Sequence, residues 1–488
     1  MTGGETAMPR QLHGSGRLDL VQALRIGDFG SQACLPGGHE TRGIGSSSCI
    51  AFVGAGGKST GMFQLARSLK PPVITTTTTH LGQWQTHWAD SHLIVQTRKD
   101  LEKALQALDG VVLITGPIGE RRGSALDRTL LDQLFQHCQQ RGFPLLIEAD
   151  GSRGKPLKAP ADHEPSIPEF VQQVVVVAGL SALGKPLTAE FVHRPELFSN
   201  LSESDPGETI HDQALVRVLL HAQGGQKNIP PTARRTALLN QADTSELQAR
   251  AKAISRGLLP AFHAAVTASL LPPPGELLDR GESARIFAVH EPIGAVILAA
   301  GEAKRFGKPK QLLDWQGEPF VRKIAHCALQ AGLKSVILVT GAYAHQVGEA
   351  VADLPVRVVH NPDWQSGQAG SLRCGLAALC AENTQVPGAA FFLLSDQPQL
   401  SSEILRALSE EHARGMAAVL APLVEGQRAN PVLFDRRTFP DLMRLEGDTG
   451  GRALFSKYSP TYLPWYDTSL LLDVDEPEDY QRLVESWG

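Results

Sequence analysis

The first half of the chain repeats one pattern, in which a short apolar run is followed by small or polar residues and then by a longer amphipathic segment. Runs this short, and this rich in Val, Ile and Leu, are typical of buried parallel strands. The segments between them, such as 101–108 and 126–139, have helical spacing. This alternation predicts an α/β sheet. The predicted strands lie at 49–53, 73–74, 111–115, 145–148 and 174–178.

The second half repeats this alternation after residue 294. Helices are predicted at 320–331 and 369–379. The fold class that follows is α/β, with two Rossmann-like three-layer domains. The strands predicted for this half lie at 295–298, 336–340, 356–359 and 389–394.

Gly, Ser and Pro mark the expected domain boundaries. Residues 1–48 are rich in Gly and Ser and predict an irregular leader with one short helix near Leu18–Ile26. A helix at 244–259 is followed by a shorter one that reaches about Leu270. Three prolines and a glycine at 272–275 cannot continue a helix. We therefore expect one domain at 49–271, a linker at 272–291 and a second domain at 292–488. Within the linker, Ile286 to His290 could form a last strand or an extended segment.

Composition and charge narrow the class of protein. The 488 residues are enough for two or three domains, and a net charge of −5 argues against a general nucleic-acid binder. No apolar run reaches the roughly 18 residues that a membrane span needs, so we expect no membrane partner. The start of the chain has no signal-peptide pattern, and the scattered cysteines favour a reducing compartment, so a cytoplasmic protein is expected.

The loop that follows the strand at 295–298 has the composition of a triphosphate site. Small residues let backbone N–H groups approach a phosphate closely, and the basic residues after them can neutralise it. The alternative is a solvated basic turn after an ordinary strand. The candidate nucleotide-binding residues are Leu298, Ala299, Ala300, Gly301, Arg305, Lys308 and Lys310.

A second glycine-rich loop follows the strand at 49–53. A strand, a Gly-rich loop, Lys-Ser and a helix form the usual design of a phosphate cradle. The match to a Walker A loop is incomplete, because its first glycine would fall at Phe52. A looser P-loop-like anion site is predicted, with a purely structural turn as the alternative. Its candidate residues are Gly56, Gly57, Lys58, Ser59 and Thr60.

Three further stretches of the first half carry polar groups at strand ends. Five threonines at 75–79 could offer hydroxyls to phosphate or metal, or form a plain β-branched strand. The segment 148–158 could hold a magnesium–nucleotide complex, or could be a capped turn. Asn240–Asp243 resembles the guanine-reading loop of GTPases without its lysine, and a simple strand-end turn is the alternative.

Four motifs give the first half a family resemblance. GAGGKST, TTTTTH, EADGSRGKPLKAPADHEP and GLSALGKPL occur in this order. They resemble the accessory-protein family named for selenium-dependent hydroxylases (YqeC-like), whose members are similar to P-loop NTPases. The resemblance implies a P-loop-like fold and a nucleotide-binding accessory module. It does not imply a particular reaction.

An aspartate ends the strand at 389–394. Asp396 comes directly after the apolar run, where a carboxylate of a parallel sheet can hold magnesium. The alternative is an aspartate that caps the turn before Pro398. The turn at Gly367 and the helix start near Ser371 could hold a phosphate or a base edge, or could be a plain connection.

The motifs of the second half resemble the molybdenum cofactor cytidylyltransferases (MobA-like). LAAGEAKRFGKPKQLL, NPDWQSGQAGSL, LLSDQPQL, RANPVLF, EGDTGGRALF and DVDEPEDY carry this resemblance. It implies a fold like that of the nucleotide-diphospho-sugar transferases. It also implies catalytic roles for Arg305, Lys310 and Asp396, metal ligation by Asp396 with Asp473 or Asp475, and pterin contacts by Asn430 and Asp448.

The resemblance further implies a reaction. The expected activity is Mg²⁺-dependent transfer of a cytidylyl group from CTP to molybdopterin, with release of pyrophosphate, for the maturation of a molybdenum hydroxylase apoenzyme. Relatives that transfer guanylate read LAGG, so Ala300 favours CTP. Two alternatives are a guanylyl or sugar-phosphate nucleotidyltransferase and a non-catalytic protein that delivers the cofactor to a hydroxylase.

Overall fold

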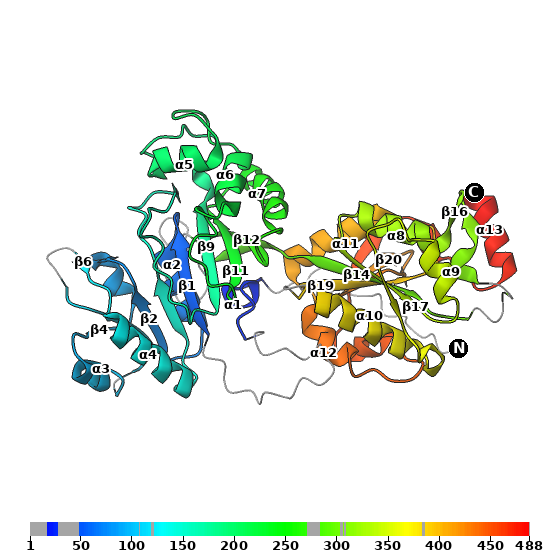
Figure 1. Cartoon of the computed structure of the whole chain (residues 1–488), viewed down its shortest axis with the longest axis horizontal. Coiled ribbons are helices and arrows are strands. Elements are labelled where there is room, and N and C mark those ends of the chain that lie inside the picture. The colour runs from blue at the N-terminus through cyan, green and yellow to red at the C-terminus, as the bar shows by residue number, and fades with distance from the viewer. Residues whose placement is uncertain are drawn as a thin grey trace, which may run out of the picture. The chain divides into compact units, whose positions relative to one another are not determined.

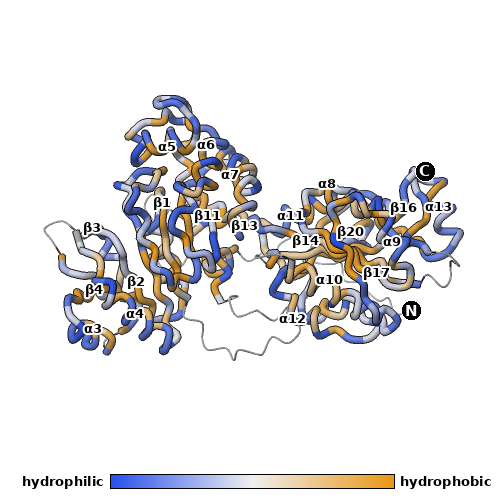
Figure 2. Tube along the Cα trace, in the orientation of Figure 1, coloured by the Kyte–Doolittle hydropathy of each residue, from blue (hydrophilic) through white to orange (hydrophobic). Residues whose placement is uncertain are grey.

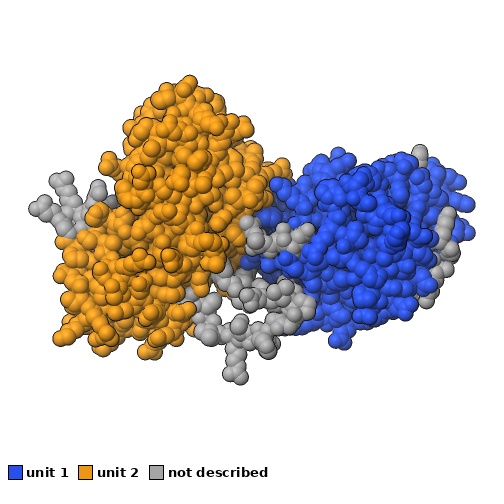
Figure 3. Space-filling model, in the orientation of Figure 1, with its two compact units in different colours: residues 1–16, 31–39, 291–488 blue, residues 17–30, 40–290 orange. Residues whose placement is uncertain are grey.

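The protein consists of two compact units (Figure 3). The computed structural model describes residues 17–27, 48–106, 108–118, 122–270, 284–302, 306, 309–382 and 386–487. The described residues up to His290 form the N-terminal unit, and those from Glu291 onward form the C-terminal unit. Both units are α/β, as the sequence predicts (Figure 1).

A nine-stranded sheet organises the N-terminal unit, in the order β13-β12-β11-β9-β1-β7-β2-β5-β4. Its neighbouring strands run parallel, except that β13 is antiparallel to β12. The five strands predicted for this half are confirmed. The strands are β1 (Cys49–Gly54), β2 (Val73–Thr77), β4 (Ser91–Ile94), β5 (Val111–Thr115), β7 (Leu145–Glu148), β9 (Gln173–Gly179), β11 (Arg234–Asn240), β12 (Ala264–Ser269) and β13 (Arg285–His290).

Helices cover both faces of this sheet. Ala51 and Val53 of β1 belong to a core shared with α4 and α7, whereas Phe52 lies against Gly61 of α2 on the other face. Alternate residues of one strand are therefore buried on opposite sides. The helices are α1 (Leu20–Ala23), α2 (Lys58–Ser68), α3 (Arg98–Ala104), α4 (Arg128–Arg141), α5 (Pro195–Ser202), α6 (Asp212–Leu220) and α7 (Ser245–Leu258), and the short strands are β3 (Leu81–Gly82), β6 (Arg122–Gly123), β8 (Leu157–Lys158) and β10 (Val192–His193).

One expectation about the edge of this unit is wrong. The second helix expected to reach Leu270 is instead the strand β12, whose six residues are all buried. A short run that is buried on both faces need not alternate between apolar and polar residues, so its spacing cannot separate a buried strand from a helix. Of the two alternatives for Ile286–His290, the last strand is confirmed: it is β13, which pairs with β12, so the sheet extends to His290. Residues 271–283 lie outside the described part of the chain.

The short helix expected near Leu18–Ile26 is confirmed as α1. Within residues 17–27, α1 begins after Asp19, whose carboxylate accepts a hydrogen bond from the Gln22 N–H at 2.7 Å. Leu20 and Ala23 are buried, and the carbonyl of Leu24 accepts a hydrogen bond from Gln173 of β9. This segment belongs to the N-terminal unit.

An eight-stranded mixed sheet organises the C-terminal unit, in the order β18-β17-β14-β19-β22-β20-β21, with β23 paired to β20. The central strands β18, β17, β14 and β19 run parallel, and β22 is antiparallel to β19. The four strands predicted here are confirmed. The strands are β14 (Ile293–Ala299), β17 (Ser335–Thr340), β18 (Arg357–His360), β19 (Ala389–Leu394), β20 (Val419–Val424), β21 (Gln427–Arg428), β22 (Val432–Asp435) and β23 (Thr461–Trp465), with a small hairpin of β15 (Asp314–Trp315) and β16 (Glu318–Pro319).

The strands of both units are the apolar centres of their folds (Figure 2). In the C-terminal unit, Ala295 and Ile297 pack in a core with α8 and α11, and Val296 packs on the opposite face with α10. Among the described residues, no helix has the length and apolar character needed to cross a bilayer. The helices are α8 (Phe320–Gln330), α9 (Ala344–Glu349), α10 (Gln368–Glu382), α11 (Ser402–Gly415), α12 (Phe439–Leu442) and α13 (Pro477–Trp487).

Candidate functional site

The glycine-rich loop of the N-terminal unit is a tight turn between β1 and α2. Gly54, Gly56 and Gly57 have φ angles of 94°, 84° and 124°, which L side chains rarely adopt. A Cβ on Gly54 would lie 2.2 Å from the carbonyl oxygen of Val177, and one on Gly56 would lie 2.5 Å from the amide nitrogen of Gly179. Glycine is required here both by the backbone angles and by the closeness of β9.

Lys58 and Ser59 at the start of α2 meet carboxylates from the end of β7. The Lys58 side chain is buried, and its Nζ donates to the carbonyl of Gly54 at 2.8 Å and lies 3.3 Å from Oδ1 of Asp150. The Ser59 hydroxyl donates to Oε2 of Glu148 at 2.6 Å. Burial raises the pKa of Glu148, although the charge of Lys58 and the Ser59 hydrogen bond act against it. A lysine, a hydroxyl and two carboxylates at one loop are the groups that a metal–phosphate site uses.

A buried chain of ion pairs continues from Asp150. Lys158 Nζ lies 2.9 Å from Asp150 and 2.8 Å from Glu164, and Arg194 lies 2.8 Å from Glu164. Burial acts to raise the pKa of Glu164, but the hydrogen bonds and charges of Arg194 and Lys158 outweigh it and lower that pKa to about 2. Burial, together with the positive charges of Arg194 and Lys158, lowers the pKa of His193 to about 4.

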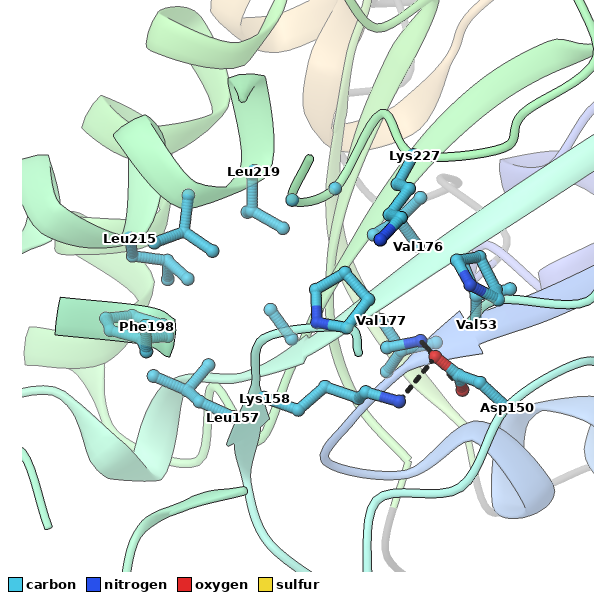
Figure 4. A pocket seen from close by; sticks show the side chains of 17 residues that line it. Val53, Asp150, Leu157, Lys158, Val176, Val177, Phe198, Leu215, Leu219 and Lys227 are labelled. Carbon is cyan, nitrogen blue, oxygen red and sulfur yellow. Dashed lines mark hydrogen bonds and ion pairs between the residues drawn. The ribbon is translucent and has the colours of Figure 1, made fainter. Parts of the chain in front are cut away.

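A small cavity lies beside Asp150 and Lys158 (Figure 4). Leu157, Phe198 and Leu215 give it a largely apolar wall, and Lys227 lies at its other side. Its volume of about 30 Å³ has room for one or two water molecules. A nucleotide needs far more space than this cavity offers.

The threonine run does not offer a row of free hydroxyls. Those of Thr75, Thr76 and Thr77 donate to backbone carbonyls of Val112, Ile114 and Glu148, and all three threonines are fully buried in β2. The Thr78 hydroxyl donates to the carbonyl of Ser166. Thr75 to Thr78 therefore form a plain β-branched strand and its end, and do not offer hydroxyls to a phosphate or a metal.

A cleft of about 860 Å³ opens in the C-terminal unit where β14 and β19 end. Its volume is within the range of small-molecule sites. Its walls come from the loop after β14, the turn around Lys310, the start of α10, the end of β19 and two late acidic residues. Among the lining residues are Leu298, Ala300, Gly301, Lys310, Gln311, Trp364, Gln365, Gly367, Gln368, Ser371, Ser395, Asp396, Asp448 and Asp475.

Lys310 lies between two carboxylates of this cleft. Its Nζ is 3.2 Å from Oδ2 of Asp396 and 2.8 Å from Oδ1 of Asp475, and it also donates to the carbonyl of Val474 at 3.0 Å. Burial alone would lower the pKa of Lys310, but the two carboxylates outweigh it and raise this pKa. The lysine is therefore held in its charged form.

Asp396 has the features of a cation ligand. Its Oδ1 is buried and has no hydrogen-bond partner among the described residues. Burial raises the pKa of Asp396 despite the charge of Lys310, and the charges of Asp473 and Asp475 raise it further. The described residues contain no ready-made group of three or more metal-ligating side chains. Such a site suits a metal that arrives with a phosphate ligand, as magnesium commonly does.

The start of α10 is closed by a loop from far along the chain. Gly367 has φ 115°, and a Cβ there would lie 2.4 Å from the carbonyl carbon of Gly447. Oδ1 of Asp448 accepts a hydrogen bond from the Gln368 N–H at 3.3 Å. The hydroxyl of Ser371 accepts one from Nδ2 of Asn361 at 3.0 Å. These contacts place Asp448 and the N-terminus of α10 together at the cleft.

The structure brings together most of the predicted residues of the second half, but not all of them. Asn430, which precedes a cis bond to Pro431, and Ala299, which is buried in β14, are not among the lining residues. Asp473 is not among them either, and instead accepts a hydrogen bond from Gln397. Arg305 and Lys308 lie outside the described residues. Gly56, Gly57, Lys58, Ser59 and Thr60 belong to the separate site of the N-terminal unit.

Some lining residues were not singled out from the sequence. Gln311 fixes the loop after β14, because its Nε2 donates to the carbonyl of Gly301 at 2.8 Å. Trp364, Gln365 and Gln368 also line the cleft. These three residues could have been identified from the sequence, because they lie around Gly367 within the NPDWQSGQAGSL motif.

Comparison with known proteins identifies both halves. Residues 50–196 match the YqeC protein family, and residues 295–461 match the MobA-like NTP transferase domain. The chain is 34% identical to "Uncharacterized protein YqeC" of Escherichia coli strain K12, over 39% of this chain and 75% of that protein. It is 32% identical to "Nicotine blue oxidoreductase" of Paenarthrobacter nicotinovorans, over 39% of this chain and 96% of that protein.

A third relative is similar over a shorter stretch. The chain is 27% identical to "Probable molybdenum cofactor guanylyltransferase" of Bacillus cytotoxicus, over 29% of this chain and 66% of that protein. The cleft at the end of β14 lies within the matched transferase domain. The chain thus belongs to the YqeC protein family through its N-terminal half and to the MobA-like NTP transferase family through its C-terminal half, which makes it a nucleotidyltransferase.

Proposed function

We propose that the C-terminal unit transfers a cytidylyl group from CTP to the terminal phosphate of molybdopterin, in the presence of Mg²⁺. The observation that carries this proposal is the position of Lys310 between Asp396 and Asp475, in a cleft beside the small-residue loop 299–301. This arrangement joins backbone N–H groups, a charged lysine and cation-binding carboxylates. Those are the groups that nucleotidyl transfer needs.

The proposed reaction is a displacement at phosphorus. An oxygen of the pterin phosphate forms a bond to the α-phosphorus of CTP, the bond from that phosphorus to the bridging oxygen breaks, and pyrophosphate leaves. Both reactants are anions, so repulsion between them and charge on the leaving group dominate the barrier. Lys310 offers its charge to the triphosphate, and Arg305 is proposed to do the same. No protein nucleophile is required.

The acidic residues fit a magnesium ion. The unpartnered Oδ1 of Asp396 is available as a ligand, and Asp475 lies on the other side of Lys310. Asp473 is a further candidate, because its charge acts on Asp396. Magnesium, when bound, would neutralise charge on the triphosphate and on pyrophosphate.

The choice of base and acceptor is the finer part of the proposal. Ala300 stands where guanylate-transferring relatives of this family have glycine, which favours CTP. The name of the Bacillus cytotoxicus relative supports a molybdenum cofactor as acceptor. Asp448 lines the cleft at the start of α10 and is proposed to contact the pterin. The dinucleotide cofactor would then serve a molybdenum hydroxylase.

The N-terminal unit is proposed to bind a nucleoside triphosphate at Gly54–Thr60. In this proposal Lys58 binds phosphate and Ser59 binds magnesium. Glu148 and Asp150 contact these two side chains. This unit would act as an accessory module in the same maturation process.

A product assay tests the transferase proposal. The full chain is incubated with Mg²⁺, molybdenum cofactor and one of the four common nucleoside triphosphates, and pyrophosphate and the dinucleotide product are measured. We expect the cytosine dinucleotide from CTP. Consumption of GTP but not CTP would show that the base assignment is wrong. Transfer of intact cofactor to a hydroxylase without pyrophosphate release would favour the delivery protein.

Nucleotide binding by the full chain tests the N-terminal proposal. Lys58→Ala should remove one class of nucleotide site, and Lys99→Ala, on the exposed face of α3, should keep it. If both variants bind nucleotide as well as the unchanged chain does, the glycine-rich loop is a structural turn and not a nucleotide site.

A further inference from the structure

We infer that the N-terminal unit selects a guanine nucleotide and that Asp243 reads the base. This inference rests on the proposed binding of triphosphate at Gly54–Thr60 and names the nucleotide that this site takes. Three observations carry it: the order of four strands, the hydrogen bonds of Asn240 and the fixed position of the Asp243 carboxylate.

The strand order places a base loop beside the phosphate loop. Strands β1, β9, β11 and β12 are neighbours and run parallel, so their carboxyl ends lie at one edge of the sheet. In the register of the sheet, Gly54 of β1 pairs with Val177 of β9. Asn240 of β11 pairs with Gly179, two residues later in β9. Two strand spacings separate β11 from β1, which is roughly 10 Å. A nucleoside triphosphate bound through its phosphates can reach such a distance with its base.

Asn240 ties the two loops together. Its Nδ2 donates to the carbonyl of Gly56 at 2.7 Å, and its Oδ1 accepts from the N–H of Leu270, after β12, at 2.9 Å. Asn240 is buried, and a Cβ on Gly57 would lie 2.3 Å from its Nδ2. Both ends of this amide are already bonded, so Asn240 holds the loops in place and is not itself the reader.

Asp243 is an exposed residue of this loop, and its carboxylate is hydrogen-bonded to the last residue of β12. Its side chain is accessible to solvent, and its Oδ1 accepts a hydrogen bond from the Ser269 hydroxyl at 2.5 Å. Gln241, with φ 62°, fixes the same loop to the end of β9, because its Oε1 accepts from the Ser181 hydroxyl at 2.6 Å. The loop is therefore anchored before any ligand binds, which lowers the entropic cost of binding.

A carboxylate distinguishes the bases by their donors. Guanine presents two adjacent donors, N1–H and the 2-amino group, which a carboxylate can accept as a pair. Adenine and cytosine present a ring-nitrogen acceptor beside their amino group, and uracil presents one donor between two carbonyls. Each of these would leave the carboxylate facing a lone pair or an unmatched oxygen, which is the kind of mismatch that gives strong discrimination.

The test is a binding titration of the full chain with fluorescent GTP, ATP, CTP and XTP. The component of binding that Lys58→Ala removes is assigned to the N-terminal unit. We expect that component to prefer GTP over ATP by at least about a hundredfold. Asp243→Asn should weaken GTP and strengthen XTP, because an amide can donate to the 2-oxo group of xanthine while it accepts from N1–H. Asp205→Asn, an exposed aspartate of the same unit, should change neither.

The outcomes distinguish a failure of the guanine assignment from a failure of the proposed triphosphate site at Gly54–Thr60. If Lys58→Ala removes no nucleotide binding, the proposed N-terminal function is wrong. If it removes ATP or CTP binding as strongly as GTP binding, or if Asp243→Asn leaves the GTP-to-XTP ratio unchanged, the phosphate site stands and the guanine assignment is overturned.

Discussion

The ammonium nitrogen of Lys310 lies 3.2 Å from Oδ2 of Asp396, although 86 residues separate them in the chain. Lys310 follows the loop after β14, and Asp396 follows β19. These two strands are parallel neighbours. The carboxyl ends of the two strands therefore place a cation and an anion at the same edge. Asp475, from the end of the chain, adds a second carboxylate on the other side of the lysine.

Asp396→Asn is expected to reduce nucleotidyl transfer at least about a hundredfold, because it removes the charge that binds the metal and leaves the shape of the side chain. The measurement is pyrophosphate release at saturating CTP and cofactor. Asp353→Asn is the control, since Asp353 pairs with Arg322 on the exposed surface of the same unit. Equal loss in both variants would mean that the effect is not specific to the cleft.

Cation binding should depend on pH through Asp396. Only the ionised carboxylate holds a metal, so affinity is present above the pKa of Asp396 and is lost as the pH falls through it. Because burial raises this pKa above the usual 3.8, the loss should come at a higher pH than for an exposed aspartate. Lys310→Ala removes the charge that opposes this rise, so the midpoint should move higher still.

Calorimetric titration of Mn²⁺ into the full chain over a range of pH measures this midpoint. Lys457→Ala is the control, because Lys457 pairs with Asp441 outside the cleft. A midpoint in Lys310→Ala that stays the same or moves to lower pH would contradict the predicted coupling between the lysine and Asp396.

Glu164 should contribute a pH-dependent part of the stability of the N-terminal unit. Its pKa falls from 4.5 to about 2 on folding. The stabilisation is therefore complete above about pH 4.5 and is lost as the pH falls toward 2. Its size is up to about 3 kcal/mol, since each pKa unit corresponds to about 1.4 kcal/mol.

Glu164→Gln should remove this contribution at neutral pH and make little difference near pH 2. Urea unfolding of the full chain, with hydrogen exchange of β1 and β9 to follow the N-terminal unit, measures it. Glu169→Gln, an exposed neighbour, serves as the control. A deficit that is the same at both pH values would indicate lost packing instead of a lost ion pair.

The sequence predicts where strands end better than it predicts what the residues there do. Short apolar runs located β1, β14 and β19, and the polar residues after them, Lys58 and Asp396, lie at the sheet edges as expected. The run at 264–269 was misassigned, because all six of its residues are buried and a strand with no solvent-facing side has no regular alternation that reveals its period.

Contacts between distant segments were not visible in the sequence. Thr75–Thr77 look like available hydroxyls until the carbonyls of β5 and β7 are placed beside them. The ion-pair network around Asp150 and Lys158 lies within one sequence motif, but its link to Arg194, 30 residues beyond Glu164, follows from no local pattern. These threonine and charged side chains form their hydrogen bonds and ion pairs only after the sheet has brought the distant segments together.

The contact between Gly367 and Gly447 allows the geometry of the cleft to be tested without changing a charged group. Gly367→Ala would place a Cβ 2.4 Å from the carbonyl carbon of Gly447 and 2.6 Å from the amide nitrogen of Asp448. Because backbone atoms cannot swing aside as a side chain can, the loop that carries Asp448 must move. A displacement of about 1 Å in a site can reduce the rate about a hundredfold, so kcat/KM should fall by ten- to a hundredfold.

Gly332→Ala is the matched control. Gly332 also has a positive φ, 88°, but a Cβ there would meet nothing within 4 Å. Both variants should lose about 1 kcal/mol of stability from backbone strain. Only Gly367→Ala should also lose activity in the pyrophosphate assay. If the two variants kept the same kcat/KM, the position of the Asp448 loop would not matter for transfer, and Asp448 would have no role in holding the acceptor.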